Sequence, residues 1–147
     1  MLLAWLLVAV FTLLGGLHAY WAAGGQWGWD AAVPTLPAKP QGSGPRVKAF
    51  NPSPAATLAV ALGLWLIALL VAMRTGLWVE AVTHFTLKWL LAVLALGLLA
   101  RAVGDFRLVD CFKQVTGSRF AWLDTRLYSP LCLLLGTGLA WVSLGSR

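Results

Sequence analysis

Two groups of residues have side chains suited to binding or proton transfer, and both lie at the ends of long apolar stretches. The first group follows the first apolar stretch and consists of His18, Tyr20, Trp21 and Trp27. An imidazole titrates near neutral pH, so His18 has the chemistry of a proton carrier or of a ligand-binding donor. Tryptophan favours the lipid headgroup region or an apolar pocket wall. A hydrogen bond from His18 to a neighbouring helix is the structural alternative.

The second group belongs to a charged segment, residues 101–126, and to the residues just after it. This segment holds five basic residues and three of the five acids of the chain. The members of the group are Arg101, Asp105, Arg107, Asp124 and Tyr128. Partial burial would fix carboxylate–guanidinium pairs among them, and charges held at membrane depth tend to be functional. The alternative is that these charges are solvated and that Asp124 caps a helix.

Neither group carries a known catalytic or metal-binding motif. The nucleophile elbow GxSxG, the zinc motif HExxH and the phosphate-binding Walker loop are absent from the sequence. Cys111 and Cys132 lack the CxxC spacing of redox or metal pairs. His18 and His84 fall at opposite ends of two expected membrane spans, so one haem iron or zinc ion cannot bind both. The sequence therefore predicts no metal and no cofactor, and it leaves open whether the protein is an enzyme.

The composition places these groups in a membrane protein. Hydrophobic residues make up 60% of the chain and charged residues 11%, whereas soluble domains carry about 25% charged residues. A soluble fold of 147 residues has no room to bury so much apolar surface. The net charge of +6 is scattered over loops and helix ends, so it suits orientation and anionic lipid headgroups rather than nucleic acid.

Four stretches reach the roughly 20 apolar residues that a membrane-spanning helix needs. They are residues 2–23, 55–73, 81–100 and 127–144. The first has no basic residue before its core and exceeds the roughly 7–15 residues of a signal-peptide core, which favours a retained helix. The prediction is one domain over residues 1–147, an all-α integral membrane bundle of four transmembrane helices.

Four spans place both termini on one side of the membrane, together with loop two (residues 74–80). Loop one (24–53) and loop three (101–126) then lie on the other side. The short loop two predicts that the second and third helices form an antiparallel hairpin. Loop one contains five prolines, and a loop of this length is either disordered or a functional cover. Pro54 is expected at the start of the second helix.

The charges of the loops predict an orientation. Loops one and three carry eight of the eleven Lys and Arg residues, which places these loops in the cytoplasm and both termini outside. Within loop three, Phe106, Val109, Phe112 and Val115 recur every three residues between charged ones. This pattern predicts a short amphipathic helix at the membrane interface between the third and fourth spans.

Several short motifs carry a resemblance. They are HAYWAAGG at residues 18–25, GDFR at 104–107, and DT at 124–125 followed by YSPLC at 128–132. Together they resemble a family of small bacterial membrane proteins classed as a domain of unknown function, over nearly the whole chain. The resemblance implies a four-span protein of the bacterial inner membrane, and it implies no particular activity.

Three functions remain open. The first is a site for a lipid or small amphipathic molecule between the first, third and fourth helices, covered by loop one, with polar contacts from the two groups and with Trp21 and Trp27 as apolar walls. The second is a structural or accessory subunit whose charged loop docks onto a membrane protein partner. The third is a small transporter, homo-oligomeric because helices two and four offer no polar path. The expected partners include membrane lipids and exclude nucleic acid.

Overall fold

The computed structural model describes most of the four apolar stretches and parts of the loops. The described residues are 1–32, 35–37, 46–48, 52–78, 82, 84–108 and 123–145. For residues 35–37, 46–48, 104–108, 124 and 125 the description covers the backbone and not the side chains.

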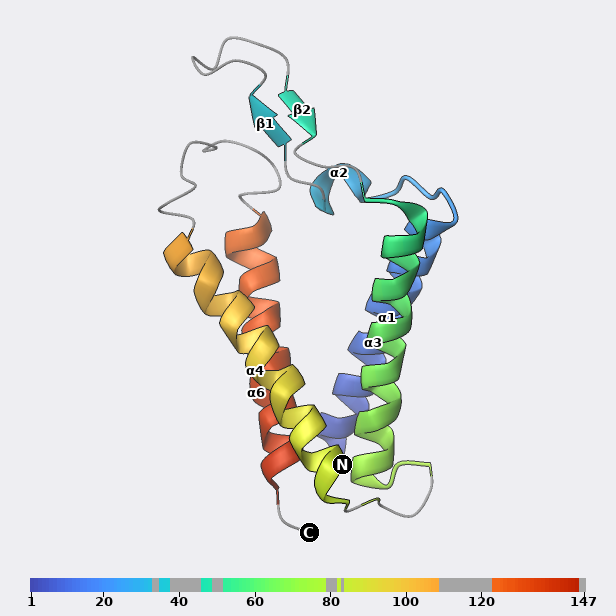
Figure 1. Ribbon diagram of the computed structural model, residues 1–147, viewed down its shortest axis with the longest axis vertical. Coiled ribbons are helices and arrows are strands. Elements are labelled where there is room, and N and C mark those ends of the chain that lie inside the picture. The colour runs from blue at the N-terminus through green and yellow to red at the C-terminus, as the bar shows by residue number, and fades with distance from the viewer. Residues whose placement is uncertain are drawn as a thin grey trace.

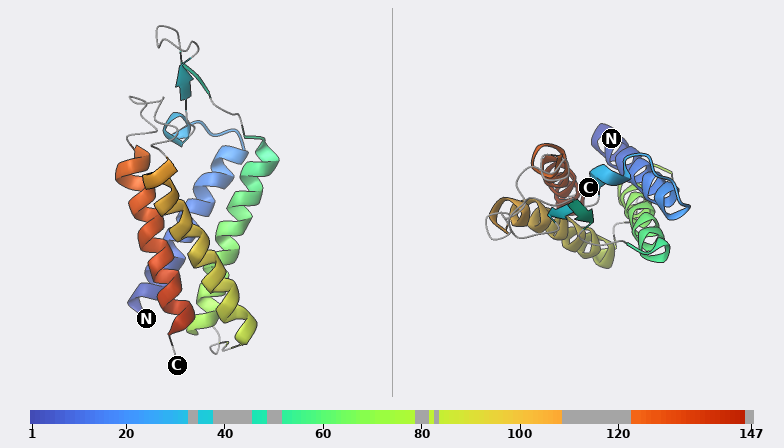
Figure 2. Two further views of the ribbon diagram at one scale, coloured as in Figure 1. Left: turned by 60° about the vertical axis from the view of Figure 1, so that its left-hand side comes forward. Right: turned by 90° about the horizontal axis from the view of Figure 1, so that it is seen from above.

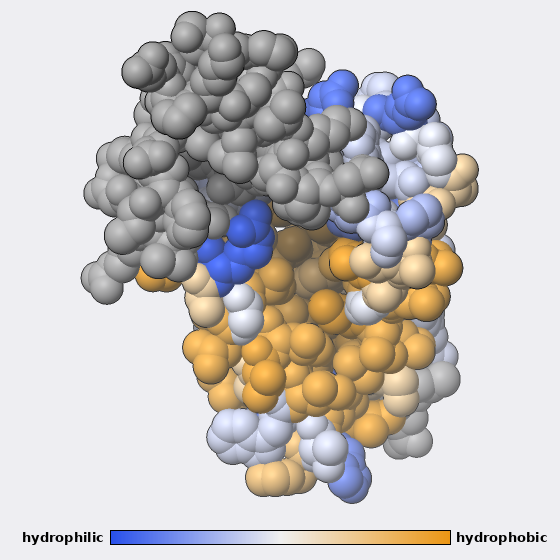
Figure 3. Space-filling model, turned by 45° about the horizontal axis from the view of Figure 1, so that its top comes forward, coloured by the Kyte–Doolittle hydropathy of each residue, from blue (hydrophilic) through white to orange (hydrophobic). Residues whose placement is uncertain are grey.

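The framework is all-helical, with four helices long and apolar enough to cross a membrane. They are α1 (Leu2–Ala22), α3 (Pro54–Thr75), α4 (Phe85–Leu108) and α6 (Ser129–Leu144). The four predicted spans are therefore confirmed. Many of their large apolar side chains are exposed, as lipid-facing helices require. Figure 3 shows the resulting hydrophobic band, with hydrophilic residues at both of its ends.

The helix boundaries follow from local capping. Pro54 takes the first position of α3 as predicted, and the Ser53 side chain accepts a hydrogen bond from the backbone N–H of Ala56 at 3.2 Å. α4 begins four residues later than the predicted 81. There the His84 Nδ1 accepts from the backbone N–H of Thr86 at 3.3 Å. His84 therefore caps a helix at the loop-two end of the molecule.

Shorter elements occupy the loops. Loop one contains the one-turn helix α2 (Trp29–Ala32) and the strands β1 (Thr35–Pro37) and β2 (Arg46–Lys48). The strands are antiparallel, with Thr35 opposite Lys48 and Pro37 opposite Arg46. The sequence analysis did not predict this hairpin. The predicted amphipathic helix falls mostly outside the described residues, although the backbone of α4 runs on to Leu108 through its first turn.

A π-helical turn, η1 (Asp124–Tyr128), leads directly into α6. Pro130 explains this widening, since proline lacks an N–H and its ring presses on the carbonyl four residues earlier, at Arg126. A π turn relieves that contact, and such turns are common at helix irregularities. The proposed capping role of Asp124 concerns a side chain that lies outside the described residues.

The four helices pack as two pairs that form a V. α1 packs along α3, and α4 packs along α6, whereas contacts between the pairs are few. Figures 1 and 2 show the pairs meeting near the two termini and separating toward loops one and three. α3 and α4 are joined by loop two and run antiparallel, as the sequence predicts, but they diverge from one another. We call the end with the termini and loop two the closed end, and the other the open end.

The hydrophobic core explains this shape, because it lies in the closed half of the molecule. Its buried members are Ala4, Leu7, Val8 and Phe11 of α1, Ala68, Val71 and Ala72 of α3, Leu87, Leu91 and Ala95 of α4, and Leu135 and Leu139 of α6. Toward the open end, buried side chains such as Ala61 of α3 and Ala102 of α4 do not belong to this core. Among the described residues, the core therefore joins the two pairs in the closed half of the molecule.

Two contacts join the pairs at the closed end. The Arg74 guanidinium of α3 donates to the carbonyl oxygens of Ser143 at 3.4 Å and Gly145 at 3.3 Å. A cation at the carbonyl end of α6 is also favoured by the helix dipole. Gly138 of α6 faces Leu7 of α1, where an added Cβ would lie 3.0 Å from the leucine Cδ2. A small residue at this position lets the two pairs approach.

A tryptophan and a glycine join α1 to α3. The indole N–H of Trp65 donates to the backbone carbonyl of Thr12 at 3.1 Å, which satisfies a polar group where lipid offers no partner. The ring lies directly over Gly15, and a Cβ there would overlap it. The α1–α3 pair therefore depends on the absence of a side chain at Gly15.

Candidate functional site

The end of α1 is shaped by two successive glycines. The N–H of Gly25 donates to the carbonyl of Tyr20 at 2.9 Å, and the N–H of Gly24 donates to that of Trp21 at 3.0 Å. This pair of bonds is a Schellman motif, and Gly24 has the left-handed conformation that the motif needs, with φ of 94°. The Gly-Gly pair thus ends the first span and turns the chain back over it.

Aromatic side chains from α1 hold the turn that follows. The indole N–H of Trp21 donates to the carbonyl of Trp27 at 2.8 Å, and the N–H of Trp27 donates to the Tyr20 hydroxyl at 3.4 Å. The Tyr20 ring occupies the space that a Cβ at Gly25 would need. Gly28, with φ of 76°, then directs the chain into α2. Contacts among Tyr20, Trp21 and Trp27 therefore stabilise this turn.

His18 is fixed by its own helix. Its Nδ1 donates to the carbonyl of Leu14 at 2.8 Å, so the expected bond to a neighbouring helix is replaced by one within α1. Because a carbonyl can only accept, the proton in this bond belongs to Nδ1. The imidazole also meets Trp21 edge-to-face, with ring centroids 5.0 Å apart.

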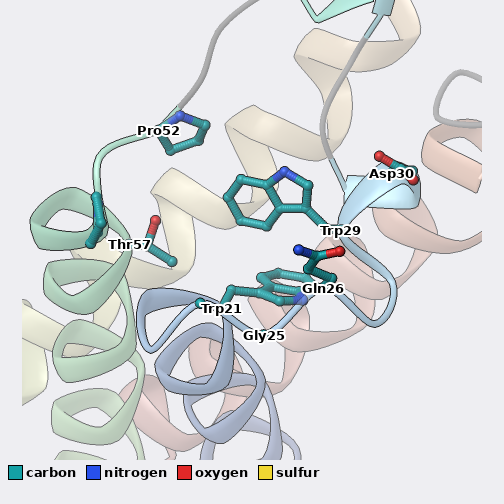
Figure 4. Close-up of a pocket in the computed structure, with 9 residues that line it drawn as sticks. Trp21, Gly25, Gln26, Trp29, Asp30, Pro52 and Thr57 are labelled. Atoms are coloured by element: carbon teal, nitrogen blue, oxygen red, sulfur yellow. The ribbon is translucent and has the colours of Figure 1, made fainter.

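A pocket of about 400 Å³ lies where α1, α2 and α3 meet (Figure 4). Its described lining residues are Trp21, Gly24, Gly25, Gln26, Trp29, Asp30, Pro52, Pro54 and Thr57. The Trp21 and Trp29 rings meet nearly at right angles, with an interplanar angle of 76° and centroids 5.8 Å apart. Pro52 and Thr57 stand opposite them (Figure 4). Of the predicted site residues, Trp21 alone is among these lining residues.

A strap crosses from one helix pair to the other at the open end. We give this name to residues 23–32, which comprise the turn after α1 and helix α2. The Tyr128 hydroxyl, at the start of α6, donates to the carbonyl of Ala31 at 3.1 Å. Figure 1 shows α2 above the gap between the two pairs. The strap therefore reaches over the open end of the bundle.

The other predicted site residues whose side chains are described do not line the pocket. Trp27 is 77% exposed and contributes its backbone rather than its ring. Arg101 is exposed on α4 at the open end. Asp105 and Arg107 belong to the last turns of α4 and Asp124 begins η1, but their side chains lie outside the described residues. The proposed carboxylate–guanidinium pairs therefore stay predictions.

Several pocket residues were missed by sequence reasoning, although signals for them exist. Trp29 belongs to the run Gly24–Trp29, which already indicates an ordered segment, and Asp30 is one of only five acids. Thr57 and Pro52 carry no such signal, because their role depends on how α3 packs beside α1. Within the described part of the chain, no three His, Cys, Asp or Glu side chains lie close enough to hold a metal.

Comparison with known proteins gives one match. The family model described as protein of unknown function (DUF3995) matches residues 11–139, a range that contains most of α1, the whole strap, α3, α4 and the larger part of α6. The expected resemblance to a domain-of-unknown-function family is thereby confirmed. Neither the curated proteins nor the solved structures gave a match.

Proposed function

We propose that this chain, which belongs to the DUF3995 family of proteins of unknown function, binds a lipid or small amphipathic molecule at the open end, between α1, α4 and α6. The observation that carries the proposal is the confinement of the buried core to the closed half of the bundle. A V-shaped pair of apolar walls in a bilayer is filled either by a lipid chain or by closure of the walls.

The energetics favour an occupant. Apolar side chains that face an unfilled gap lose their dispersion contacts, and cavities in proteins cost roughly 24 cal/mol per Å³. Closing the V along its whole length would bring the upper halves of α1 and α6 into contact. That movement would displace the strap from its bond to Tyr128. An acyl chain fills the gap without breaking this bond.

Polar groups at the open end could bind the polar head of such a molecule. His18 offers Nε2 as a polar contact, because its Nδ1 is engaged with the Leu14 carbonyl. Arg101 adds a cation on α4, about two turns before the helix ends, and the strap limits access to the gap. A ligand with an apolar tail and a polar head would place each part in a matching environment.

Native mass spectrometry of the full chain, released from mild detergent, tests the proposal. We expect a retained adduct with the mass of a lipid. The variant Tyr128→Phe removes the bond between the strap and α6, and the loss of one such bond should lower adduct retention about fivefold. Tyr20→Phe is the matched control, since its hydroxyl bonds within the strap side alone. Absence of any adduct, or equal retention in both variants, would refute the site.

The orientation belongs to the same proposal. Loops one and three, with their basic excess, face the cytoplasm of a bacterial inner membrane, and the termini face outward. Three basic residues lie outside loops one and three and count against this orientation. One of them, Arg74, is engaged with the end of α6, which reduces its weight as an orientation signal. Alkaline phosphatase fused after residue 147 should be active and a fluorescent protein there dark. The opposite result reverses the orientation and leaves the binding site untouched.

A further inference from the structure

We propose that the pocket between α1, α2 and α3 is a cage for an organic ammonium group. This inference does not rest on the lipid site above, because none of the pocket's described lining residues comes from α4 or α6. The two sites can therefore be tested, and can fail, separately.

The tryptophan pair supplies the first argument. Trp21 and Trp29 are half-buried and stand nearly perpendicular with centroids 5.8 Å apart. In the angle between two such rings, one group can lie against both π faces. Cations are attracted to indole faces within about 6 Å of the centroid, and aromatic cages of this kind recognise quaternary ammonium groups. Pro52 and Thr57 enclose the opposite side (Figure 4).

The charges around the pocket also favour a cation. Asp30 is the one ionisable residue among the described lining residues, although basic residues dominate loops one and three.

The amino end of α3 is the competing feature, because a helix start attracts anions. Here its donors are largely absent or occupied. Pro54 has no N–H, and the N–H groups of Ala56 and Thr57 donate to the side chain and the carbonyl of Ser53. The two π faces, together with the exposed Asp30, therefore decide the sign of the preferred ligand.

The turn makes the cage rigid before a ligand arrives. Trp21 is fixed by its bond to the Trp27 carbonyl and by its contact with His18. Trp29 follows Gly28, whose left-handed φ of 76° sets the direction of α2. A preformed aromatic cage loses little conformational entropy on binding, which suits a small cation.

Choline is the probe for the test, and 3,3-dimethylbutan-1-ol is its uncharged isostere. We expect an NMR titration of the full chain in phosphatidylglycerol nanodiscs to show choline binding at least about tenfold more tightly than the alcohol. Equal binding of the two compounds, or no binding of choline, overturns the proposal without recourse to a variant.

Variants locate the site. Trp29→Leu keeps apolar bulk but removes a π face, and should weaken choline binding about tenfold. Trp78→Leu, at the closed end, is the control and should leave binding unchanged. Circular dichroism confirms that both variants fold, and Trp29→Phe, which restores a weaker π face, should recover part of the affinity. Unchanged binding in folded Trp29→Leu would contradict the cage.

Two sources of the ammonium group are distinguished by the disc lipid. If phospholipid headgroups fill the cage, free choline will bind less tightly in phosphatidylcholine discs than in phosphatidylglycerol discs. If a soluble ammonium compound is the natural ligand, the two affinities will agree. The lipid adduct of the proposed function is a separate readout, so the failure of one proposal can be told from the failure of the other.

Discussion

The contact between Gly15 and Trp65 yields a prediction that can be worked out in detail. A Cβ at Gly15 would overlap the Nε1 side of the indole and lie 3.1 Å from its Cε2, so Gly15→Ala forces the ring away from α1. Overpacking of this kind costs about 1–3 kcal/mol. The displaced ring also loses its bond to the Thr12 carbonyl, worth roughly 0.6 kcal/mol inside a membrane.

The neighbouring Gly16 provides a matched comparison for the free-energy cost of Gly15→Ala. A Cβ at Gly16 meets nothing within 4 Å, so Gly16→Ala shares the helix-propensity gain of an alanine without the clash. Equilibrium unfolding in mixed detergent micelles should therefore find Gly15→Ala less stable than Gly16→Ala by about 2 kcal/mol. Adding Trp65→Leu should abolish the effect of Gly15→Ala. Equal stabilities of the two alanine variants, or strict additivity with Trp65→Leu, would refute this packing.

Further predictions concern the closed end and the two caps, and the same unfolding assay measures each. Arg74→Met removes two charged hydrogen bonds to the end of α6 and should cost about 1–3 kcal/mol, whereas an unchanged stability would mean that this tie is not formed. Gly138→Leu inserts a side chain against Leu7 and should lower the free energy of unfolding by about 1–3 kcal/mol. An unchanged stability would mean that α6 and α1 do not approach closely at this position. Gly24→Ala puts a Cβ on a left-handed residue and should cost about 1 kcal/mol, unless the Schellman turn is absent. Ser53→Ala should cost about 1 kcal/mol through the lost cap, and no loss would show the start of α3 to be held otherwise.

The sequence was sufficient to find the spans, because membrane insertion depends on local hydrophobicity that is read residue by residue. It also placed Pro54 at a helix start, since proline lacks the donor that is unused there. It did not reveal the pairing of α1 with α3. The short loop two suggested that α3 and α4 pack as a hairpin, whereas the fit of Trp65 over Gly15 couples α3 to α1.

The sequence indicated some residues near the strap, but it did not indicate their contacts. His18, Tyr20 and Trp21 were chosen for their chemistry and lie at the expected end of α1. Their actual partners are backbone groups nearby in the chain: the carbonyl of Leu14 for His18, and the carbonyl and N–H of Trp27 for Trp21 and Tyr20. Tyr128 was also chosen, but its bond to Ala31 spans 97 positions, and no local pattern encodes such a contact.

The central claim is that the two helix pairs are joined at the closed end and hold a ligand between them at the open end. An experimental structure of the full chain in lipid nanodiscs tests it most directly. We expect an elongated apolar density between the open-end halves of α1 and α6, beneath the strap. A four-helix bundle with α1 and α6 packed along their whole length, and no density between them, would contradict it.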